Sequence, residues 1–403
     1  MKARYQYRFY PTDQQRQSLA QLFGCVRVVW NDALALSKAS KFPGYNSLAK
    51  SLTLSKKTEE RKWLSDVSSV PLQQSLKQLE VAYKNYFDSL KGKRKGKKVG
   101  QPRFKKKTNS QSATFTSSAF SIKDGEVYLA KIGNLKPIWS RELPSEPSSV
   151  TVIKDCADRY FLSFVVQIEP SSIDSEAKPC LRPRGDAKGE RASANSQSVG
   201  IDLGIKTFAV MSNGHIAESP DYSKTDRKIR KLQRKLGRSI QGSKRRNRTR
   251  IQIAKRHNQI SDTRKDFLHK LTTQVVSKNQ TIILEDLNVS GLVKNRNLAR
   301  AISLQGWREF RTLIESKSEK FGRDFRVISR WEPTSQKCSE CGFKWGKIDL
   351  SVRSILCLGC GIEHDRDENA SKNIEMVGMG HRHDLKCTSR DGKTTPVARP
   401  NEA

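Results

Sequence analysis

Residues 338–371 read CSECGFKWGKIDLSVRSILCLGCGIEHDRDENAS, and the rest of the chain is organised around them. Their four cysteines form two CxxC pairs, Cys338 with Cys341 and Cys357 with Cys360, and fifteen residues separate the pairs. A glycine follows each pair and allows the tight turn in which backbone N–H groups reach a thiolate. Two facing pairs supply the tetrahedral thiolate set that Zn²⁺ prefers, so the stretch predicts a structural zinc site.

Acidic residues form the second informative pattern. Asp365 and Asp367 follow the last cysteine and are not explained by zinc, while Asp202 lies within VGIDLG and Glu285 ends TIILE. An acid in an apolar strand is costly unless it binds a cation or a partner. Converging carboxylates are what hard Mg²⁺ ions require, and two such ions can promote hydrolysis of a phosphodiester. Asp202, Glu285 and Asp367 are therefore candidate metal-binding and catalytic residues.

Each acid also has a structural alternative. Asp367 could cap the helix that DENAS predicts, and Glu285 could be a surface acid at the end of its strand. Asp202 is harder to dismiss, because Ile201 and Leu203 flank it. The order of strand, long insertion, strand, zinc module and helix favours one shared site over three unrelated acids.

Charge indicates the class of partner. The chain of 403 residues has 76 Lys and Arg against 41 Asp and Glu, a net charge of +35. With no amphipathic or lipidation signal, this charge favours nucleic acid over membrane; a merely basic soluble protein is the alternative. No long apolar run predicts a transmembrane helix, and the N-terminus lacks the apolar core of a signal peptide. The other cysteines show no pairing pattern, so we expect reduced thiols and a cytosolic protein.

Two segments concentrate the positive charge. Residues 91–107 contain ten basic residues and no acid, which predicts a flexible loop that contacts phosphate. Residues 224–256 contain fifteen Lys or Arg and one acid, and their apolar residues keep helical spacing around a break near residues 241–242. This pattern predicts a basic helical hairpin; a coiled-coil dimer face is the alternative. The candidate nucleic-acid contacts are Lys93, Arg94, Lys95, Lys97, Arg103, Lys105, Arg230, Arg234, Lys244, Arg245, Arg246 and Arg248.

Hydrophobic periodicity divides the chain into a β-rich and an α/β part. Residues 3–9 alternate as a half-buried strand, and a capping box at Thr12 and Gln15 begins a helix. A second amphipathic helix is predicted near residues 71–90. Short strands between residues 113 and 168, including a hairpin, predict an all-β unit that the opening strand can join, which would make the helices an insertion.

Eight segments of the chain resemble the TnpB family, the transposon-encoded RNA-guided endonucleases related to the type V CRISPR effectors. In family order they are YRFYPTDQQ, FGCVRVVWNDAL, GQPRFKKK, VGIDLGIKTFAV, RKDFLHKLT, ILEDLNVSGL, SLQGW and HDRDENASKNI. The resemblance implies a RuvC-like nuclease in which Asp202, Glu285 and Asp367 are the catalytic triad and bind two Mg²⁺ ions. It selects Asp367 over Asp365, a choice that composition alone leaves open.

The fold that the resemblance implies is a multidomain α+β architecture. It comprises a wedge-type β-barrel (1–10 and 108–169), a helical recognition insertion (11–107), a linker (170–197), a RuvC-like RNase H-fold α/β domain (198–335 and 362–378), a zinc ribbon that binds target nucleic acid (336–361) and a disordered tail (379–403).

The implied function is RNA-guided cleavage of double-stranded DNA beside a short adjacent motif. The guide would be a noncoding RNA from the transposon end, and the protein a monomer in the prokaryotic cytosol. Three rivals remain. An RNA-guided repressor is expected to lack one of the triad acids. An accessory transposase is expected to need a tyrosine beside a pair of histidines, and the HRH sequence at 381–383 in the tail is a poor candidate for that pair. A zinc-ribbon scaffold would leave Asp202 unexplained.

Overall fold

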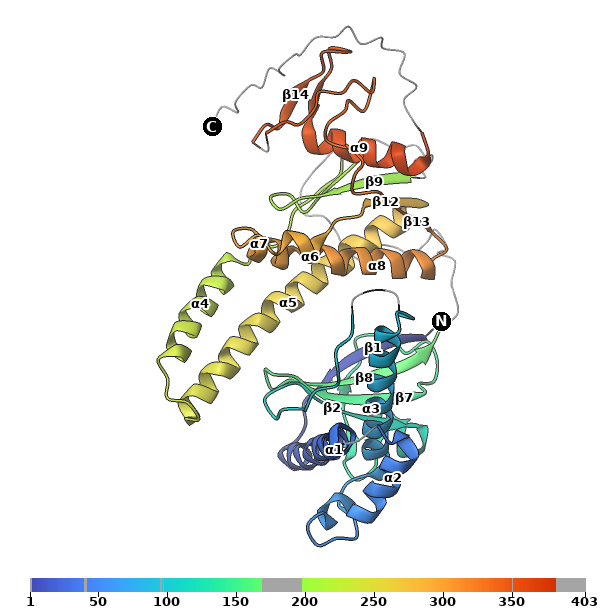
Figure 1. The fold of residues 1–403 in the computed structure, drawn as a ribbon, viewed down its shortest axis with the longest axis vertical. Coiled ribbons are helices and arrows are strands. Elements are labelled where there is room, and N and C mark those ends of the chain that lie inside the picture. The colour runs from blue at the N-terminus through green and yellow to red at the C-terminus, as the bar shows by residue number, and fades with distance from the viewer. Residues whose placement is uncertain are drawn as a thin grey trace. The chain divides into compact units, whose positions relative to one another are not determined.

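The structure is a computed structural model that describes residues 2–39, 42–94, 96, 98–168, 198–349 and 351–381 (Figure 1). Internal contacts divide these residues into two units. The first contains the described residues up to 168 together with 230–256, and the second contains 198–229 and the described residues from 257 onward. The predicted linker, the tail from residue 382, and the candidate contacts Lys95 and Lys97 lie outside the described residues.

An antiparallel five-stranded sheet in the order β2-β7-β8-β1-β6 forms the base of the first unit. Strand β1 pairs with β8 along its whole length, from Lys2 opposite Gln167 to Phe9 opposite Tyr160. The opening strand therefore belongs to the β unit, and the helices are inserted between strands, as predicted. The strand bounds are β1 Lys2–Phe9, β2 Gln111–Thr116, β6 Pro137–Ile138, β7 Ser149–Lys154 and β8 Tyr160–Gln167.

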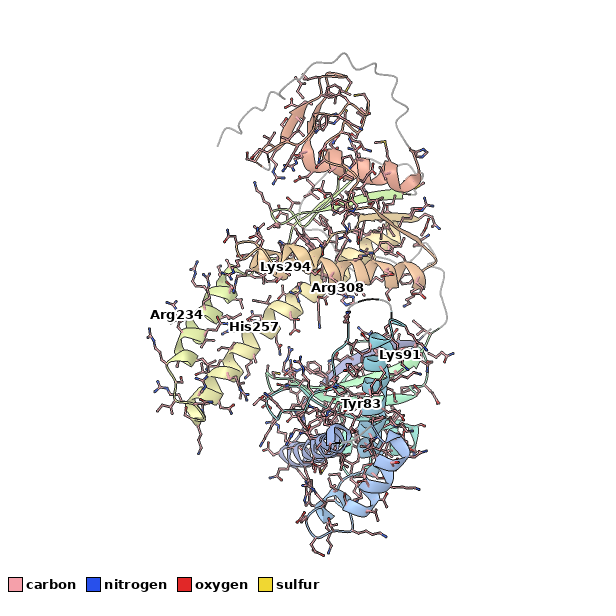
Figure 2. All side chains as sticks on the ribbon, viewed as in Figure 1. Tyr83, Lys91, Arg234, His257, Lys294 and Arg308 are labelled. Carbon is pink, nitrogen blue, oxygen red and sulfur yellow. The ribbon has the colours of Figure 1, made fainter. Side chains whose placement is uncertain are left out.

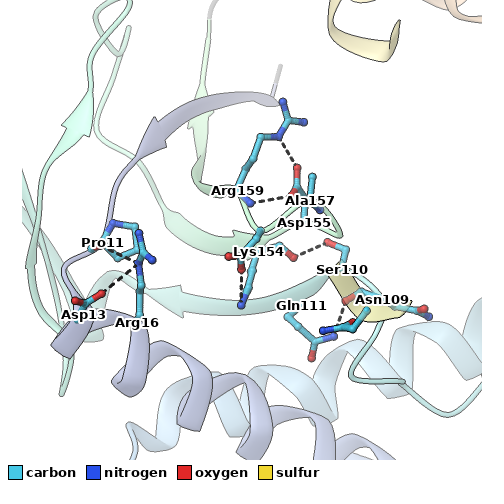
Figure 3. A network of polar contacts seen from close by, with 12 residues as sticks. Pro11, Asp13, Arg16, Asn109, Ser110, Gln111, Lys154, Asp155, Ala157 and Arg159 are labelled. Atoms are coloured by element: carbon cyan, nitrogen blue, oxygen red, sulfur yellow. Dashed lines mark hydrogen bonds and ion pairs between the residues drawn. The ribbon is translucent and has the colours of Figure 1, made fainter. Parts of the chain in front are cut away.

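The predicted hairpin at the end of this sheet is formed by β7 and β8. Asp155 closes its turn: one carboxylate oxygen accepts from the backbone N–H groups of Ala157 at 2.8 Å and Arg159 at 2.9 Å, and the other accepts from Arg159 Nε at 2.7 Å (Figure 3). These bonds satisfy backbone donors that the tight turn leaves unpaired.

A small three-stranded sheet packs into the same core. It consists of β3 (Phe120–Lys123), β4 (Glu126–Leu129) and β5 (Gly133–Leu135), and its inward residues Val127 and Leu129 are fully buried. The chain passes from β5 to β6 across a single residue, which joins the two sheets at a corner. Among the described residues no sheet closes on itself, so the predicted closed β-barrel is not found.

Three helices make up the insertion: α1 (Asp13–Ala39), α2 (Gly44–Ser55) and α3 (Ser69–Leu90). The predicted capping box begins α1, because Thr12 N–H donates to Gln15 Oε1 at 3.0 Å and Gln15 N–H donates to Thr12 Oγ1 at 3.3 Å. By length and composition α1 could cross a membrane, but half of its apolar window is buried inside the protein, as in the core helix of a globular domain. The sequence patterns predicted α1 and α3 but not α2. Short 3₁₀ turns lie at η1 (Lys62–Ser65) and η2 (Ser117–Ala119).

The predicted basic hairpin consists of α4 (Ser223–Gly237) and α5 (Lys244–Lys278), and α5 is longer than expected. Its turn contains Gly242 at a φ of +83°, a left-handed conformation that favours glycine. Arg246 closes the turn by donating to the carbonyl oxygens of Leu236 at 2.6 Å and Ser239 at 3.0 Å.

A mixed five-stranded sheet in the order β11-β10-β9-β12-β13 organises the second unit. Its strands are β9 (Ser198–Leu203), β10 (Ala209–Met211), β11 (Ile216–Ala217), β12 (Thr281–Glu285) and β13 (Asp324–Ile328); β9, β12 and β13 run parallel. The C-terminal half of α5 and helix α8 (Trp307–Lys320) share one core with Ile282 and Leu284 of β12, whereas Ile283 between them packs with Ile374 of α9 (Arg366–Met379). Figure 1 shows α9 and α8 on opposite faces of this sheet. The remaining elements are α6 (Val289–Leu292), α7 (Ala299–Gln305), β14 (Ser354–Leu356) and β15 (Glu363–Asp365).

Helix α9 approaches strand β9 so closely that only glycine fits at Gly200. A Cβ atom there would lie 2.2 Å from the backbone oxygen of Ser371 and 2.5 Å from the backbone nitrogen of Glu375. Both are main-chain atoms of α9, so no side-chain rotation can relieve the overlap. The position of α9 on the sheet therefore depends on the absence of a side chain at residue 200.

We predict that Gly200→Ala destabilises the protein by about 1–3 kcal/mol, because α9 must move away from β9. Thermal unfolding of the full chain measures this as a lower Tm. Gly24→Ala is the control, since a Cβ at this helical position meets nothing within 4 Å and alanine is the better helix former. Equal Tm values for Gly200→Ala and the wild-type protein would contradict the close contact.

Candidate active site

Asp202 and Glu285 lie side by side at the ends of two parallel strands. Ile201 of β9 pairs with Leu284 of β12, and each acid is the next residue of its strand. Both side chains are half-buried. The carboxyl ends of parallel strands are a common location for binding sites in α/β sheets, because side chains from neighbouring strands converge there.

Asp367 joins them from the first turn of α9. The helix runs opposite to β9: Ser198 Oγ donates to Glu375, and Ser371 lies against Gly200. Continuing in this direction, the next turn of α9, which carries Asp367, lies against the strand end at Asp202. The structure therefore places the three predicted acids at one edge of the sheet, although among the described residues only the four cysteines bring their ligand atoms within 4.8 Å of one another.

Electrostatics supports this convergence. The pKa of Asp202 is raised to about 7, chiefly by burial and then by the negative charges of Asp367 and Glu285. Burial, followed by the charge of Asp286, raises the pKa of Glu285. Ionising Asp202 and Glu285 without a further counter-charge is therefore unfavourable, and a cation beside them would remove the penalty.

Neighbouring acids on both sides of the site have other partners. Asp286 accepts from Arg311 at 2.6 Å and also from Arg330, and these bonds lower its pKa. Asp365 is the N-cap of α9: its Oδ1 accepts from the backbone N–H groups of Asp367 at 2.9 Å and Glu368 at 3.0 Å. The alternative in which Asp367 caps this helix is therefore wrong, and Asp365 has a structural role that the sequence alone left open.

Arg353 is a site residue that the sequence analysis missed. It precedes β14 of the cysteine-rich module, and its Nη1 donates to Asp367 Oδ2. Both side chains line an open groove of about 600 Å³ that also includes Lys206, Thr207 and Asp365. No sequence pattern around Arg353 identifies it, because the contact depends on how the module folds back onto α9.

The four predicted cysteines form one cluster. Their sulfurs all lie within 4.8 Å of one another, with 3.8 Å between Cys338 and Cys360 and 3.6 Å between Cys341 and Cys357. A tetrahedral zinc with Zn–S bonds of about 2.3 Å requires sulfurs about 3.8 Å apart. The residues therefore fit zinc without rearrangement.

The two CxxC turns have the same backbone geometry. Cys338 N–H donates to Phe343 at 2.9 Å and Cys357 N–H donates to Ile362 at 2.9 Å, and the glycine after each pair has a φ near +75°. Buried His364, also missed from the sequence, places Nε2 3.1 Å from Cys338 Sγ. An N–H donor in this position would stabilise a metal-bound thiolate.

Two buried asparagines attach the first cysteine turn to α9. Asn369 accepts from Ser339 N–H at 2.8 Å and donates to the carbonyl oxygen of Lys337 at 2.8 Å. Asn373 donates to the carbonyl oxygens of Thr334 and Lys337, each at 2.8 Å. The cysteine cluster is thereby fixed to the helix that positions Asp367.

Most of the candidate nucleic-acid contacts that the structure describes are exposed, but two have structural roles. Arg246 closes the α4–α5 turn, as described above. Lys105 is half-buried, with Nζ 4.1 Å from the centre of the Trp30 ring, and burial lowers its pKa to about 8. Asn31 of α1 exchanges hydrogen bonds with the backbone of Lys105 at 2.8 and 3.1 Å, so this end of the basic loop is fixed to α1 rather than free. The exposed candidates are Lys93, Arg94, Arg103, Arg230, Arg234, Lys244, Arg245 and Arg248 (Arg234 is labelled in Figure 2).

Three family matches cover much of the chain. Residues 163–296 match the OrfB_IS605 family, described as "Probable transposase". Residues 307–374 match "Cas12f1-like, TNB domain", and residues 1–40 match the "Helix-turn-helix domain" of OrfB_IS605. In this structure the described part of residues 1–40 is strand β1 followed by the single helix α1.

Two relatives align with this chain over nearly its whole length. "Putative RNA-guided DNA endonuclease" of Streptomyces pristinaespiralis is 41% identical, over 100% of this chain and 97% of that relative. "Putative RNA-guided DNA endonuclease InsQ" of Escherichia coli (strain K12) is 30% identical, over 93% and 92%. A solved Cas12f1–sgRNA–target DNA complex matches with a TM-score of 0.46 and 15% identity, covering 89% of this chain and 82% of that one.

Opposite effects of pH on stability are expected for two aspartates near this site. Because the folded-state pKa of Asp202 is about 7, well above that of an unfolded chain, ionisation of Asp202 costs stability as the pH rises from about 4 to 7. In magnesium-free buffer at pH 8, Asp202→Asn should raise Tm by at least about 2 °C, and the gain should shrink as the pH falls towards 4.

Asp286→Asn is the matched comparison. Its lowered pKa means that the ionised carboxylate stabilises the folded state above pH 4, so this variant should have a lower Tm than the wild-type protein at pH 8. Equal pH dependence of Tm in both variants would contradict the electrostatic assignment.

The cysteine cluster predicts one tightly bound zinc per chain. Cys357→Ser should abolish stoichiometric zinc, measured by elemental analysis of the purified protein, because three thiolates and a hydroxyl bind zinc far less tightly. Cys156→Ser, which changes an exposed cysteine outside the cluster, should retain it. Full zinc content in Cys357→Ser would overturn the assignment.

Proposed function

The chain belongs to the OrfB_IS605 TnpB family, and from this premise we propose that it is a metal-dependent, RNA-guided DNA endonuclease. The observation that carries the proposal is the convergence of Asp202, Glu285 and Asp367 from two strand ends and one helix. A protein that only binds DNA has no use for three mutually repelling carboxylates, one of them with a pKa of about 7.

Asp202, Glu285 and Asp367 would hold two Mg²⁺ ions, which in such sites activate water and stabilise the leaving oxygen of a phosphodiester. Asp202 binds a cation only when ionised, so its affinity for the cation should increase with pH around neutrality. Arg353 orients the Asp367 carboxylate through its hydrogen bond. Asp365 holds the first turn of α9 by capping it and contributes no ligand in this proposal.

We propose that the partners are a transposon-end guide RNA and target double-stranded DNA. The net charge of +35 and the exposed basic residues of residues 91–107 and the α4–α5 hairpin support phosphate contacts. In an RNA-guided enzyme base pairing supplies sequence recognition, so the protein needs basic surfaces more than a base-reading helix. We propose the division that the family resemblance implies: a wedge-type unit with inserted helices, a RuvC-like nuclease and a zinc ribbon that binds target nucleic acid.

A catalytically silent RNA-guided repressor is the main alternative, and an accessory transposase is the other. The repressor is disfavoured because all three acids are present in the sequence. The sequence candidate for the histidine pair that a DNA-joining transposase would need is HRH at 381–383, and His383 lies outside the described residues.

Two aspartates separated by one residue provide the test of this proposal. We expect Asp367→Asn to lose at least about a hundredfold in cleavage rate, because it removes a metal ligand. Asp365→Asn should keep most of the activity, since asparagine caps a helix as well as aspartate. The assay uses the full-length protein with its co-purifying RNA, guide-matched DNA and Mg²⁺.

Asp202→Ala completes the comparison and should be inactive. Cleavage by Asp202→Ala at the wild-type rate would refute the site. Loss of activity in Asp365→Asn with wild-type activity in Asp367→Asn would show that the two aspartates have been assigned the wrong way round.

A further inference from the structure

A second groove opens on the Glu285 side of the three acids. Its volume is about 360 Å³, and it lies among the end of β12, α6 and α8. Three arginines line it, Arg308, Arg311 and Arg330, against the acids Glu285 and Glu315. Three arginines in one groove can donate to a negatively charged ligand, although Asp286 already binds two of them, Arg311 and Arg330.

Trp307, a residue that lines this groove, has a buried and unused hydrogen-bond donor. The residue lines the groove and is 5% exposed, and its Nε1 has no hydrogen-bond partner among the described residues. Leaving a buried N–H unpaired costs about 1–3 kcal/mol, so such donors are uncommon unless a ligand or water completes them. A phosphate oxygen in the groove would be a suitable acceptor.

The arginines can contribute to the same ligand. Arg308 is exposed in the first turn of α8 (Figure 2). Arg311 and Arg330 are oriented by their bonds to Asp286, yet their side chains remain 40% and 39% exposed. Each guanidinium has five N–H donors, so binding one carboxylate leaves others for a phosphate.

Trp331, the residue after Arg330, has an exposed aromatic ring. Trp331 is 86% exposed, whereas Trp30 and Trp307 are buried and the other three tryptophans are half-buried. Ile328 pairs with Glu285 in the sheet, and Trp331 is three residues further on, at most about 11 Å away along the chain. Aromatic rings beside basic grooves are the usual platforms for unpaired nucleobases.

We propose that this groove binds the sugar–phosphate backbone of single-stranded DNA, and that Trp331 stacks on one of its bases. The proposal rests on the proposed nuclease function and extends it, because it identifies how the strand is held on the Glu285 side. Stacking requires an unpaired base, so the groove selects single-stranded over double-stranded DNA.

Photo-crosslinking tests the stacking contact directly. The full-length protein with its co-purifying RNA is mixed, without Mg²⁺, with an oligonucleotide containing 5-iododeoxyuridine, and the adducts are mapped by mass spectrometry. We expect an adduct at Trp331 that is lost in Trp331→Ala. Adducts confined to other residues, or an adduct at Trp331 with single-stranded RNA but not DNA, would overturn the proposal.

Binding measurements test the groove. In about 0.2 M salt, Trp331→Ala should weaken affinity for the same oligonucleotide by about five- to a hundredfold, and Trp331→Phe should restore most of it. Trp307→Phe, which keeps an aromatic ring but removes the N–H, and Arg308→Gln should each weaken binding. Arg308→Gln should also reduce the slope of log affinity against log salt by about 0.7.

Lys320→Gln is the matched control, because it removes one positive charge from the same helix about 18 Å from Arg308. Equal losses of affinity in Lys320→Gln and Arg308→Gln would show that only net charge matters, and would overturn the proposal that the groove binds the strand. Since binding is measured without cleavage, this result is independent of the three acids. An active nuclease whose groove variants all bind the oligonucleotide as the wild-type protein does would refute the proposed DNA-binding groove but not the nuclease function.

Discussion

The contact between α9 and β9 at Gly200 is the constraint on which the site depends. Without a side chain there, the backbone of the helix lies directly on the strand, and the first turn of α9 reaches the strand end that carries Asp202. The same helix holds the first cysteine turn through Asn369 and Asn373. One helix therefore connects the cysteine cluster to the candidate catalytic carboxylates. This arrangement explains why the cysteine pairs lie next to Asp367 in the sequence: the cysteine module braces the helix that carries Asp367.

Asp202 differs from its neighbours Asp286 and Asp365 in electrostatic environment. Asp286 has two arginines and Asp365 has two backbone N–H groups, so each is satisfied within the protein. Asp202 is instead surrounded by protein and by like charges, and both raise its pKa. Such a site is unfavourable when empty of cations, and a divalent ion relieves the repulsion. Stability is thus lower at the candidate site, as is common at active sites.

Much of this could be predicted from the sequence, because the informative residues are local. The CxxC spacing predicted the cysteine cluster, and the capping box at Thr12 predicted the start of α1. Asp202 and Glu285 were identified from the apolar strands that carry them, whereas the family resemblance selected Asp367 over Asp365. Other features depend on distant contacts and leave no local pattern. Arg353 reaches Asp367 only through the fold of the cysteine module. The Lys105 side chain lies over the Trp30 ring because Asn31 binds the backbone of Lys105. The closed barrel was expected from the family resemblance, and the described strands form two joined sheets instead.

Anomalous diffraction from Mn²⁺-soaked crystals of the full chain tests the central claim most directly. Manganese prefers the same oxygen ligands as magnesium and can be located by its anomalous signal. The account predicts manganese peaks among the carboxylates of Asp202, Glu285 and Asp367, and their loss in Asp202→Asn. Manganese bound only elsewhere, or peaks at these carboxylates that persist unchanged in Asp202→Asn, would contradict it.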